Sequence, residues 1–368
     1  MTTSENDRGG ARHDFLQAHG WGDARVIPFP GDASTRSYFR LDDGARQAIL
    51  MDAPAARETA SCPPGASVEE RLQLGYTATA RLAGNNIAAF AGIAEALTQR
   101  GFSAPRIEAA DLDAGLAIIE DLGDGLFARL IPDAAHEGIL YAAAIDALAA
   151  LYRSSFPDTV HWREGGRWDV LEYDDTALIA ESELFLDWYA AQRAGVTVSD
   201  DMRDHWRGLW RDALAQSRTA EPGLVLRDFH AENLIWLPER EGLARVGLLD
   251  FQDALFGHPA YDVVSLLEDL RRDVSPGLHQ ALKDRFVEKA RLTDAKGFEA
   301  AYSILGAQRN MKIYGFCVRS AVRDGKPKYL PLLPRMSAHL NRDLAHPALA
   351  AVRAFVERYV PGALEAQP

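Results

Sequence analysis

The chain contains the stretch Leu226-Arg227-Asp228-Phe229-His230-Ala231-Glu232-Asn233, followed downstream by Leu248-Leu249-Asp250-Phe251. Residues 234–237 and 244–249 are β-prone runs, and residues 238–242 between them have the composition of a turn. A hairpin of this kind returns the chain to its starting point. We therefore expect Asn233, at its entrance, and Asp250, at its exit, to lie side by side.

An Asp, an Asn five residues later and a second Asp at a strand end form the catalytic pattern of kinase-like phosphotransferases. In that pattern Asp228 accepts the proton of an attacking hydroxyl, while Asn233 and Asp250 bind Mg²⁺ on the nucleotide phosphates. Hard oxygen ligands with no nearby Cys suit Mg²⁺ better than Zn²⁺. Each residue alone is also explained as a turn residue or a strand-end cap, but the joint pattern favours the catalytic interpretation.

Composition restricts the class of protein. The chain has 368 residues, an apolar fraction of 47%, a net charge of −13 and two Cys. The negative charge argues against a general affinity for nucleic acid or an anionic membrane, and two Cys form no disulfide framework. Residues 1–10 are polar and predict a disordered tail without a signal peptide, and no apolar run approaches membrane-spanning length. These features predict a cytoplasmic protein.

The order of the expected elements predicts an α+β fold of two lobes. Strands are expected at 26–30, 37–41, 47–51, 105–109 and 115–120, and helices at 13–19, 68–84 and 87–100. Beyond residue 125 the pattern is mostly helical, apart from the hairpin. We therefore predict a small β-rich lobe over residues 11–121 and a larger helical lobe over residues 122–368. The resemblance to phosphotransferases implies that the first lobe binds nucleotide and that the second holds the catalytic loop, metal site and acceptor. The lack of regular βαβ alternation disfavours a doubly wound sheet.

The sequence resembles the aminoglycoside phosphotransferase and choline kinase group, which has a bilobal protein-kinase-like fold. Within that group it is most similar to the bacterial N-acetylmuramate/N-acetylglucosamine anomeric kinases of cell-wall recycling. The resembling stretches, besides the catalytic segment, are 31–40, 50–54, 119–124, 257–262 and 310–327. Together they span nearly the whole chain.

The resemblance implies roles for further residues. Residues 31–37, with Ser34, Thr35 and Arg36, would form the loop over the nucleotide phosphates. Glu120 and Leu122 would contact adenine through a backbone carbonyl and amide. Asp262 would be a structural anchor behind the metal-binding segment, although it is equally explained as a helix N-cap.

The chain departs from the kinase pattern in one important position. Protein kinases carry a third-strand Lys that contacts the α- and β-phosphates, whereas this chain has no Lys before Lys283. Arg36 or Arg40 would then carry the phosphate charge, since a guanidinium binds phosphate through two parallel hydrogen bonds. Otherwise Mg²⁺ carries more of that charge.

The implied reaction is transfer of the ATP γ-phosphoryl, with Mg²⁺, to the anomeric hydroxyl of an amino sugar in peptidoglycan recycling. Glu183 and Trp188 are candidate acceptor contacts, although Trp188 fits a core stripe equally well. Arg309 and Asn310 are further candidates, for a lactyl carboxylate or an N-acetyl group, with a solvated helix face as the alternative.

Two other functions stay open at this point. The chain could phosphorylate another small hydroxyl acceptor, such as an aminoglycoside or a choline-like alcohol. From a different class, it could be a nucleotide-binding pseudokinase that acts as a scaffold, given the missing Lys. The intact Asp228, Asn233 and Asp250 argue against that last function.

Overall fold

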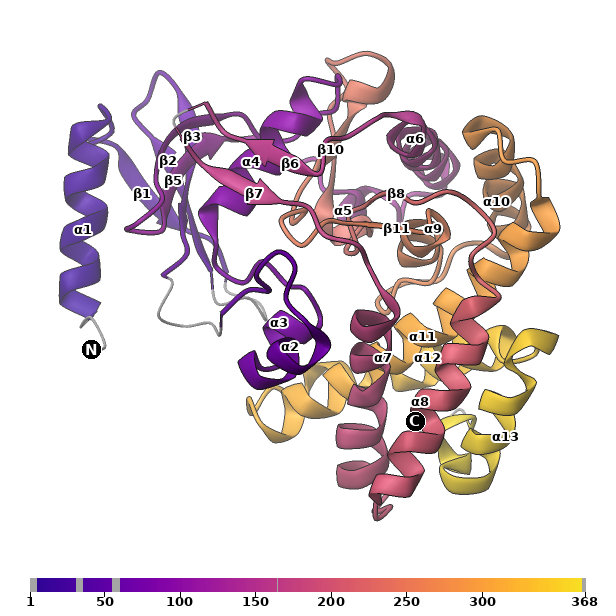
Figure 1. Cartoon of the computed structure of the whole chain (residues 1–368). Helices are drawn as coiled ribbons and strands as arrows, with labels where there is room; N and C mark the ends of the chain where they lie inside the picture. The colour runs from indigo at the N-terminus through magenta and orange to yellow at the C-terminus, as the bar shows by residue number, and fades with distance from the viewer. Residues whose placement is uncertain (1–4, 31–35, 55–59, 164, 366–368) are drawn as a thin grey trace. The chain divides into compact units, whose positions relative to one another are not determined.

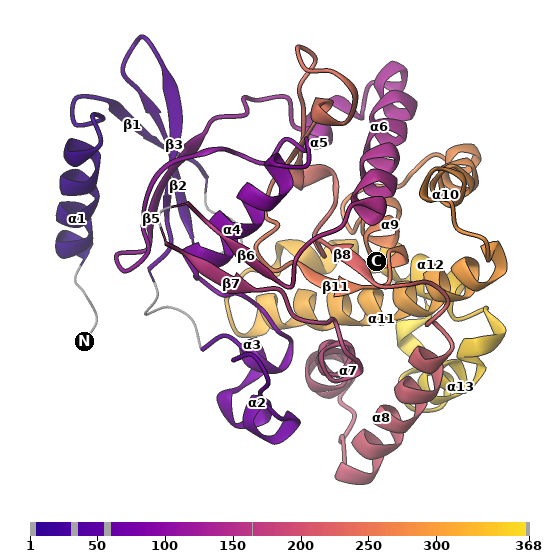
Figure 2. The same ribbon diagram turned by 45° about the horizontal axis from the view of Figure 1, so that its top comes forward.

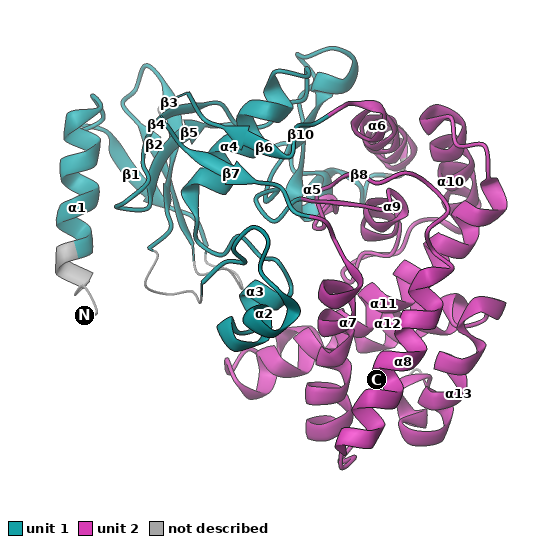
Figure 3. Cartoon of the chain, in the orientation of Figure 1, with its two compact units in different colours: residues 1–133, 156–171, 232–254 teal, residues 134–155, 172–231, 255–368 magenta. Residues whose placement is uncertain are grey.

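The computed structural model describes residues 5–30, 36–54, 60–163 and 165–365, and the chain forms two compact units (Figure 3). Unit 1 contains residues 1–133, 156–171 and 232–254, and unit 2 contains residues 134–155, 172–231 and 255–368. Each unit is thus assembled from three separate stretches of chain. The boundary expected at residue 121 falls within the first stretch of unit 1, and the expected division of roles stays a prediction.

Unit 1 is built on a five-stranded antiparallel sheet in the order β1-β2-β3-β5-β4 (Figure 1). Its strands are β1 (Arg25–Pro28), β2 (Ser37–Asp42), β3 (Gln47–Asp52), β4 (Ile107–Asp111) and β5 (Leu116–Glu120). The central strand β3 is buried along residues 48–52. Each of these strands lies within about three residues of its predicted position.

The N-terminal segment is a helix rather than a tail. Helix α1 spans Glu5–Ala18, so the prediction of a disordered segment over residues 1–10 is wrong for residues 5–10. The Arg8 guanidinium donates to the Asp52 carboxylate and, at 2.6 Å, to the Ala114 carbonyl. Phe15 and Leu16 pack into the core cluster on the sheet. Burial of these side chains, which local composition does not reveal, stabilises the helix.

The remaining elements of unit 1 connect the sheet to the predicted hairpin. They are α2 (Val68–Leu74), α3 (Tyr76–Thr79), α4 (Ile87–Thr98), α5 (Phe127–Leu130), β6 (Thr159–His161), β7 (Arg167–Asp169), β9 (Leu234–Trp236) and β10 (Val246–Leu248). The helix predicted over residues 68–84 is two short helices, because Gly75 adopts a φ of 99° between them. A positive φ of this kind is open to Gly at little cost and ends the helical hydrogen bonding.

Unit 2 is mostly helical and is organised around one long helix, α11. Its elements are α6 (Ala134–Arg153), α7 (Asp175–Leu184), α8 (Asp200–Ala215), β8 (Gly223–Val225), β11 (Leu255–Gly257), α9 (Ala260–Leu267), α10 (Pro276–Ala290), α11 (Ala295–Val322), α12 (Leu333–Asp343) and α13 (Ala350–Tyr359). Helix α7 packs against α11 and crosses it (Figure 2), and it continues as a π-helix over Phe185–Arg193. Gly315 permits this close approach, because a Cβ there would lie 2.2 Å from the Leu184 carbonyl oxygen.

Candidate active site

The predicted catalytic loop in unit 2 is fixed by helix α9. The Asp262 carboxylate accepts hydrogen bonds from the backbone N–H groups of Leu226 (2.7 Å) and Arg227 (2.8 Å), and the Ser265 hydroxyl donates to the Arg227 carbonyl (3.1 Å). Arg227 has a φ of 70°, which is strained for a residue with a side chain. Both oxygens of Asp262 bind the loop and the helix has no side-chain N-cap. This geometry supports the anchor interpretation over the N-cap.

The Asp262 carboxyl titrates far from its ordinary range. Burial raises its pKa to about 7, although the two backbone donors act in the opposite direction. Above that pH the ionised form, which accepts both hydrogen bonds, predominates. The two hydrogen bonds that Asp262 accepts from the loop are therefore strongest above that pH.

A buried carboxylate, Glu181 on α7, binds three side chains, one of which belongs to the loop. It is fully buried and accepts hydrogen bonds from Tyr173 and Arg227. Lys312 on α11 pairs with it at 2.9 Å. Burial alone would raise the pKa of Glu181, but the charges of Arg227 and Lys312 outweigh it and lower the pKa. Glu181 is therefore ionised and holds two cations in fixed positions.

Asp228 lies within reach of these cations and is itself partly exposed. Burial would raise its pKa, but Lys312 and Arg309 are among the charges that outweigh it, and the pKa is lowered. The carboxylate is consequently ionised at neutral pH. An ionised, accessible carboxylate is what a proton acceptor requires.

The predicted hairpin is present in unit 1 and places Asn233 beside the segment that leads to Asp250. Strands β9 and β10 pair in antiparallel register with Leu234 opposite Leu248. The next residues continue the pairing, since the N–H of Leu249 donates to the Asn233 carbonyl at 3.0 Å. Asp250 then adopts a left-handed φ of 56°. The prediction that the hairpin brings its two ends together is confirmed.

The oxygen atoms at the end of this hairpin fit a hard divalent cation. Gln252 donates to Oδ1 of Asp250 at 2.9 Å, and Arg36 binds the same oxygen at 3.0 Å. The Asp250 side chain is 41% exposed. No cluster of three or more His, Cys, Asp or Glu side chains in the described ranges suits a metal. A metal here would draw further ligands from phosphate and water, which is usual for Mg²⁺.

The structure separates the two candidate arginines. The Arg36 side chain is 10% exposed and donates to Asp250 and to the Gly84 carbonyl, each at 3.0 Å. Arg40 instead pairs with Asp121 (2.6 Å) and Asp124 (2.9 Å). Arg36 therefore lies at the candidate metal site, whereas Arg40 is neutralised by two carboxylates.

For the other predicted nucleotide contacts, the structure gives the surroundings of Glu120 and Leu122 only. Ser34 and Thr35 lie outside the described residues. Glu120 ends β5, and its carboxylate binds Arg106 (3.2 Å) and Arg240 (2.7 Å). Leu122 follows it and is buried. Their adenine contacts stay a prediction.

The predicted acceptor residues lie in unit 2, and most are engaged by other side chains. Glu183 pairs with Arg207 at 2.6 Å, and Trp188 is half-buried on the π-helical segment. The alternative of a solvated helix face is wrong for Arg309 and Asn310, which are 5% and 0% exposed. The Asn310 amide donates to Glu268 (2.8 Å) and Asp343 (2.9 Å), a placement that does not support a sugar contact. Arg309 donates to Ser265 at 2.9 Å and so joins the loop-holding network.

Sequence reasoning assigned no structural role to Glu181 or Lys312. A signal for Glu181 was present, because its neighbours at helical spacing are apolar and buried: Ala177, Leu178, Leu184 and Phe185. A carboxylate on the apolar face of a helix requires buried partners. For Lys312 the sequence offers no comparable pattern.

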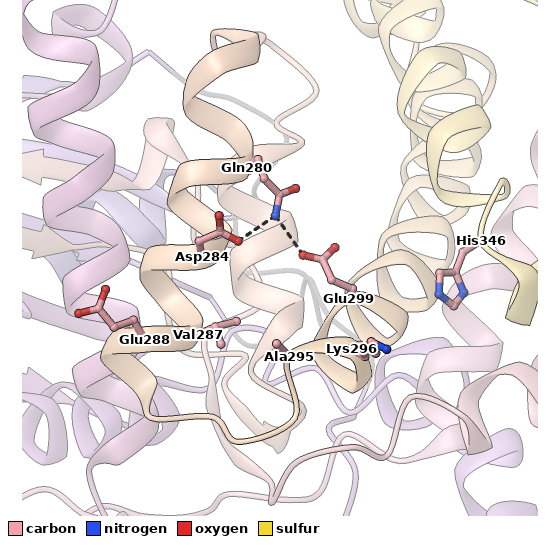
Figure 4. Close-up of a pocket in the computed structure, with 8 residues that line it drawn as sticks. All are labelled: Gln280, Asp284, Val287, Glu288, Ala295, Lys296, Glu299 and His346. Carbon is pink, nitrogen blue, oxygen red and sulfur yellow. Dashed lines mark hydrogen bonds between the residues drawn. The ribbon is translucent and has the colours of Figure 1, made fainter.

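A pocket of about 630 Å³ lies elsewhere in unit 2, over α10 and α11 (Figure 4). The Gln280 amide lies there between the carboxylates of Asp284 and Glu299. None of the predicted catalytic, metal-binding or nucleotide-binding residues lines it. We therefore do not assign the chemistry to this pocket.

None of the helices in the described part of the chain has the length and apolar composition of a membrane-spanning segment.

A family model described as "Phosphotransferase enzyme family" matches residues 25–295. Two similar proteins are named N-acetylmuramate/N-acetylglucosamine kinase. The protein from Caulobacter vibrioides is 44% identical over 98% of each chain. The protein from Pseudomonas aeruginosa is 32% identical over 92% of this chain and 90% of its own.

Solved structures also resemble this chain. The ADP-bound aminoglycoside phosphotransferase APH(2'')-Ib has a TM-score of 0.55 and 14% identity, covering 90% of this chain and 96% of its own. An ethanolamine kinase of Plasmodium vivax has a TM-score of 0.58 and 11% identity, covering 96% and 91%. At such identity the likeness shows the fold alone. It confirms the predicted protein-kinase-like α+β fold.

Proposed function

Because the chain belongs to the phosphotransferase enzyme family, we propose that it transfers the γ-phosphoryl of ATP to the anomeric C1 hydroxyl of N-acetylmuramate or N-acetylglucosamine. The product is the sugar 1-phosphate, and the reaction belongs to peptidoglycan recycling in the cytoplasm. The observation that carries the proposal is the near full-length similarity to kinases named for these two sugars.

Asp228 is the proton acceptor in this proposal. Its lowered pKa keeps it ionised, and its loop is held by Asp262. A positioned general base contributes about 10²- to 10⁴-fold to the rate. The anomeric hydroxyl is more acidic than an ordinary alcohol, so a carboxylate of low basicity suffices.

Asn233 and Asp250 would hold Mg²⁺, which when bound neutralises phosphate charge. Gln252 orients the Asp250 carboxylate through its hydrogen bond to Oδ1. Arg36, rather than Arg40, supplies the fixed positive charge that a third-strand Lys supplies in protein kinases. Residues 31–37, of which 31–35 lie outside the described residues, would cover the phosphates, and Glu120 and Leu122 would contact adenine through the backbone.

The test is ³¹P NMR of the purified protein with Mg-ATP and either amino sugar, with kanamycin and choline in parallel samples. We expect a sugar 1-phosphate resonance with the amino sugars. Asp228→Asn should abolish it, whereas Asp284→Asn, an exposed carboxylate on α10, should leave it unchanged. Turnover only with kanamycin or choline would overturn the acceptor assignment, and no turnover with any acceptor would favour the pseudokinase.

A further inference from the structure

The two proposed acceptors differ in one chemical group. N-acetylmuramate carries a lactyl ether that ends in a carboxylate, and N-acetylglucosamine has a neutral hydroxyl in its place. A carboxylate that leaves water for a protein site requires a cation or several hydrogen-bond donors. An enzyme that prefers the acidic sugar therefore needs a cation one sugar ring away from its general base.

Three Lys and Arg side chains of unit 2, namely Lys312, Arg309 and Arg227, act on Asp228 together with His230. Arg227 precedes Asp228 in the chain, and Glu181 binds both Arg227 and Lys312. Arg227 is 1% exposed and is bound by Glu181, and Arg309 is 5% exposed and is bound by Ser265. The Lys312 side chain is 22% exposed. Of these three, Lys312 is therefore the cation that a ligand can reach.

The environment of Lys312 fixes its ammonium group. Glu181, which is fully buried, holds Nζ at 2.9 Å and is itself held by Arg227 and Tyr173. An ammonium has three N–H donors, so one ion pair does not saturate it. The lysine is thus preorganised, charged and partly accessible, which lowers the entropic cost of binding an anion.

Resting on the proposed function, we infer that Lys312 recognises the carboxylate of the acidic acceptor sugar and sets the preference between N-acetylmuramate and N-acetylglucosamine. Glu181 holds Lys312 in place and does not itself touch the substrate. This role concerns the acceptor sugar and not the nucleotide. Lys312 is therefore not a substitute for the third-strand Lys that contacts the nucleotide phosphates in protein kinases.

The experiment compares kcat/KM for three acceptors: N-acetylmuramate, its neutral methyl ester and N-acetylglucosamine. In the wild-type protein the ester should react about 10- to 100-fold less efficiently than the acid, the range for a hydrogen bond to a charged group. Lys312→Met should lose about the same factor with N-acetylmuramate and stay within about threefold with N-acetylglucosamine. It should also no longer distinguish the acid from the ester.

Two further variants sharpen the result. Lys312→Arg retains the charge and should recover most of the efficiency with N-acetylmuramate. Lys296→Met, an exposed lysine on the same helix, is the matched control and should behave as wild type.

An equal loss with both sugars in Lys312→Met would overturn the inference, because Lys312 would then act on the phosphoryl group or on Asp228. Equal wild-type efficiency with the acid and its ester would also overturn it, and this comparison stands even if Lys312→Met does not fold. Wild-type turnover of N-acetylglucosamine but not of N-acetylmuramate would overturn the inference about Lys312 and leave the proposed function standing. Turnover of neither sugar would overturn the proposed function as well.

Discussion

The contrast between Arg36 and Arg40 yields the sharpest prediction about nucleotide binding. Arg36→Met removes a guanidinium that reaches Asp250 and the Gly84 carbonyl at 3.0 Å each. Arg40→Met removes one that is paired with Asp121 and Asp124, of which Asp124 is 66% exposed. Both changes delete one positive charge from the same unit.

The expected magnitudes differ because the two environments differ. A hydrogen bond from a buried guanidinium to an ionised group contributes about 1.5–3 kcal/mol. Arg36→Met should therefore lower kcat/KM for ATP about 10- to 150-fold, and more if both arms of the guanidinium bind phosphate. The Arg40 guanidinium is already neutralised by Asp121 and Asp124 and contributes little charge to a nucleotide, so Arg40→Met should lower kcat/KM for ATP at most about fivefold.

The assay is steady-state kinetics with ATP varied at saturating sugar, together with calorimetric titration of Mg-ADP into each variant. Arg36→Lys is a useful third variant, because it keeps the positive charge and loses the two parallel N–H donors of the guanidinium. A larger loss for Arg40→Met than for Arg36→Met would refute the reasoning. So would unchanged nucleotide affinity in Arg36→Met.

Three other outcomes are expected. Gln252→Ala removes the hydrogen bond that orients Asp250 and should raise the Mg²⁺ concentration for half-maximal activity about 10- to 100-fold; a titration with unchanged midpoint would contradict this. Asp262→Asn leaves one buried loop N–H without an acceptor and should lower kcat by about 100-fold through misplacement of the base, which rapid-quench measurement of the chemical step checks. Burial lowers the pKa of His258 from 6.5 to about 4, so its contribution to stability is present above pH 6.5 and is lost as pH falls toward 4. Between pH 7 and pH 4 the free energy of unfolding of His258→Gln should accordingly fall less steeply than that of the wild type, by up to about 1.4 kcal/mol per pH unit. Urea denaturation at several pH values measures this, and an equal fall in the two proteins would contradict the lowered pKa of His258.

The elements that sequence predicts well are those whose signal is local. The hairpin from Asn233 to Asp250 follows from two short β-prone runs and a turn between them, and both strands form as expected. The roles expected for Asp228, Asn233 and Asp250 also rest on spacing along the chain and stay a prediction. In these segments propensity and tertiary structure agree.

The elements that it misses depend on contacts between distant residues. Residues 5–10 become helical because α1 packs on the sheet and Arg8 binds Asp52, 44 residues away. The role inferred for Lys312 depends on its ion pair with Glu181, which no spacing in the sequence reveals. The choice between Arg36 and Arg40 likewise required knowing which carboxylate each one meets.

The alternation of the chain between its two units constrains how the protein is made. Residues 232–254 complete unit 1, yet they are synthesised after residues 134–155 and 172–231, which belong to unit 2. On the ribosome, unit 1 therefore remains incomplete until the β9–β10 hairpin and most of the polypeptide have been synthesised. A premature stop anywhere before residue 254 leaves both units without part of their chain. Neither unit can be obtained by truncation, and separate expression of either one would require its three segments to be rejoined by new linkers.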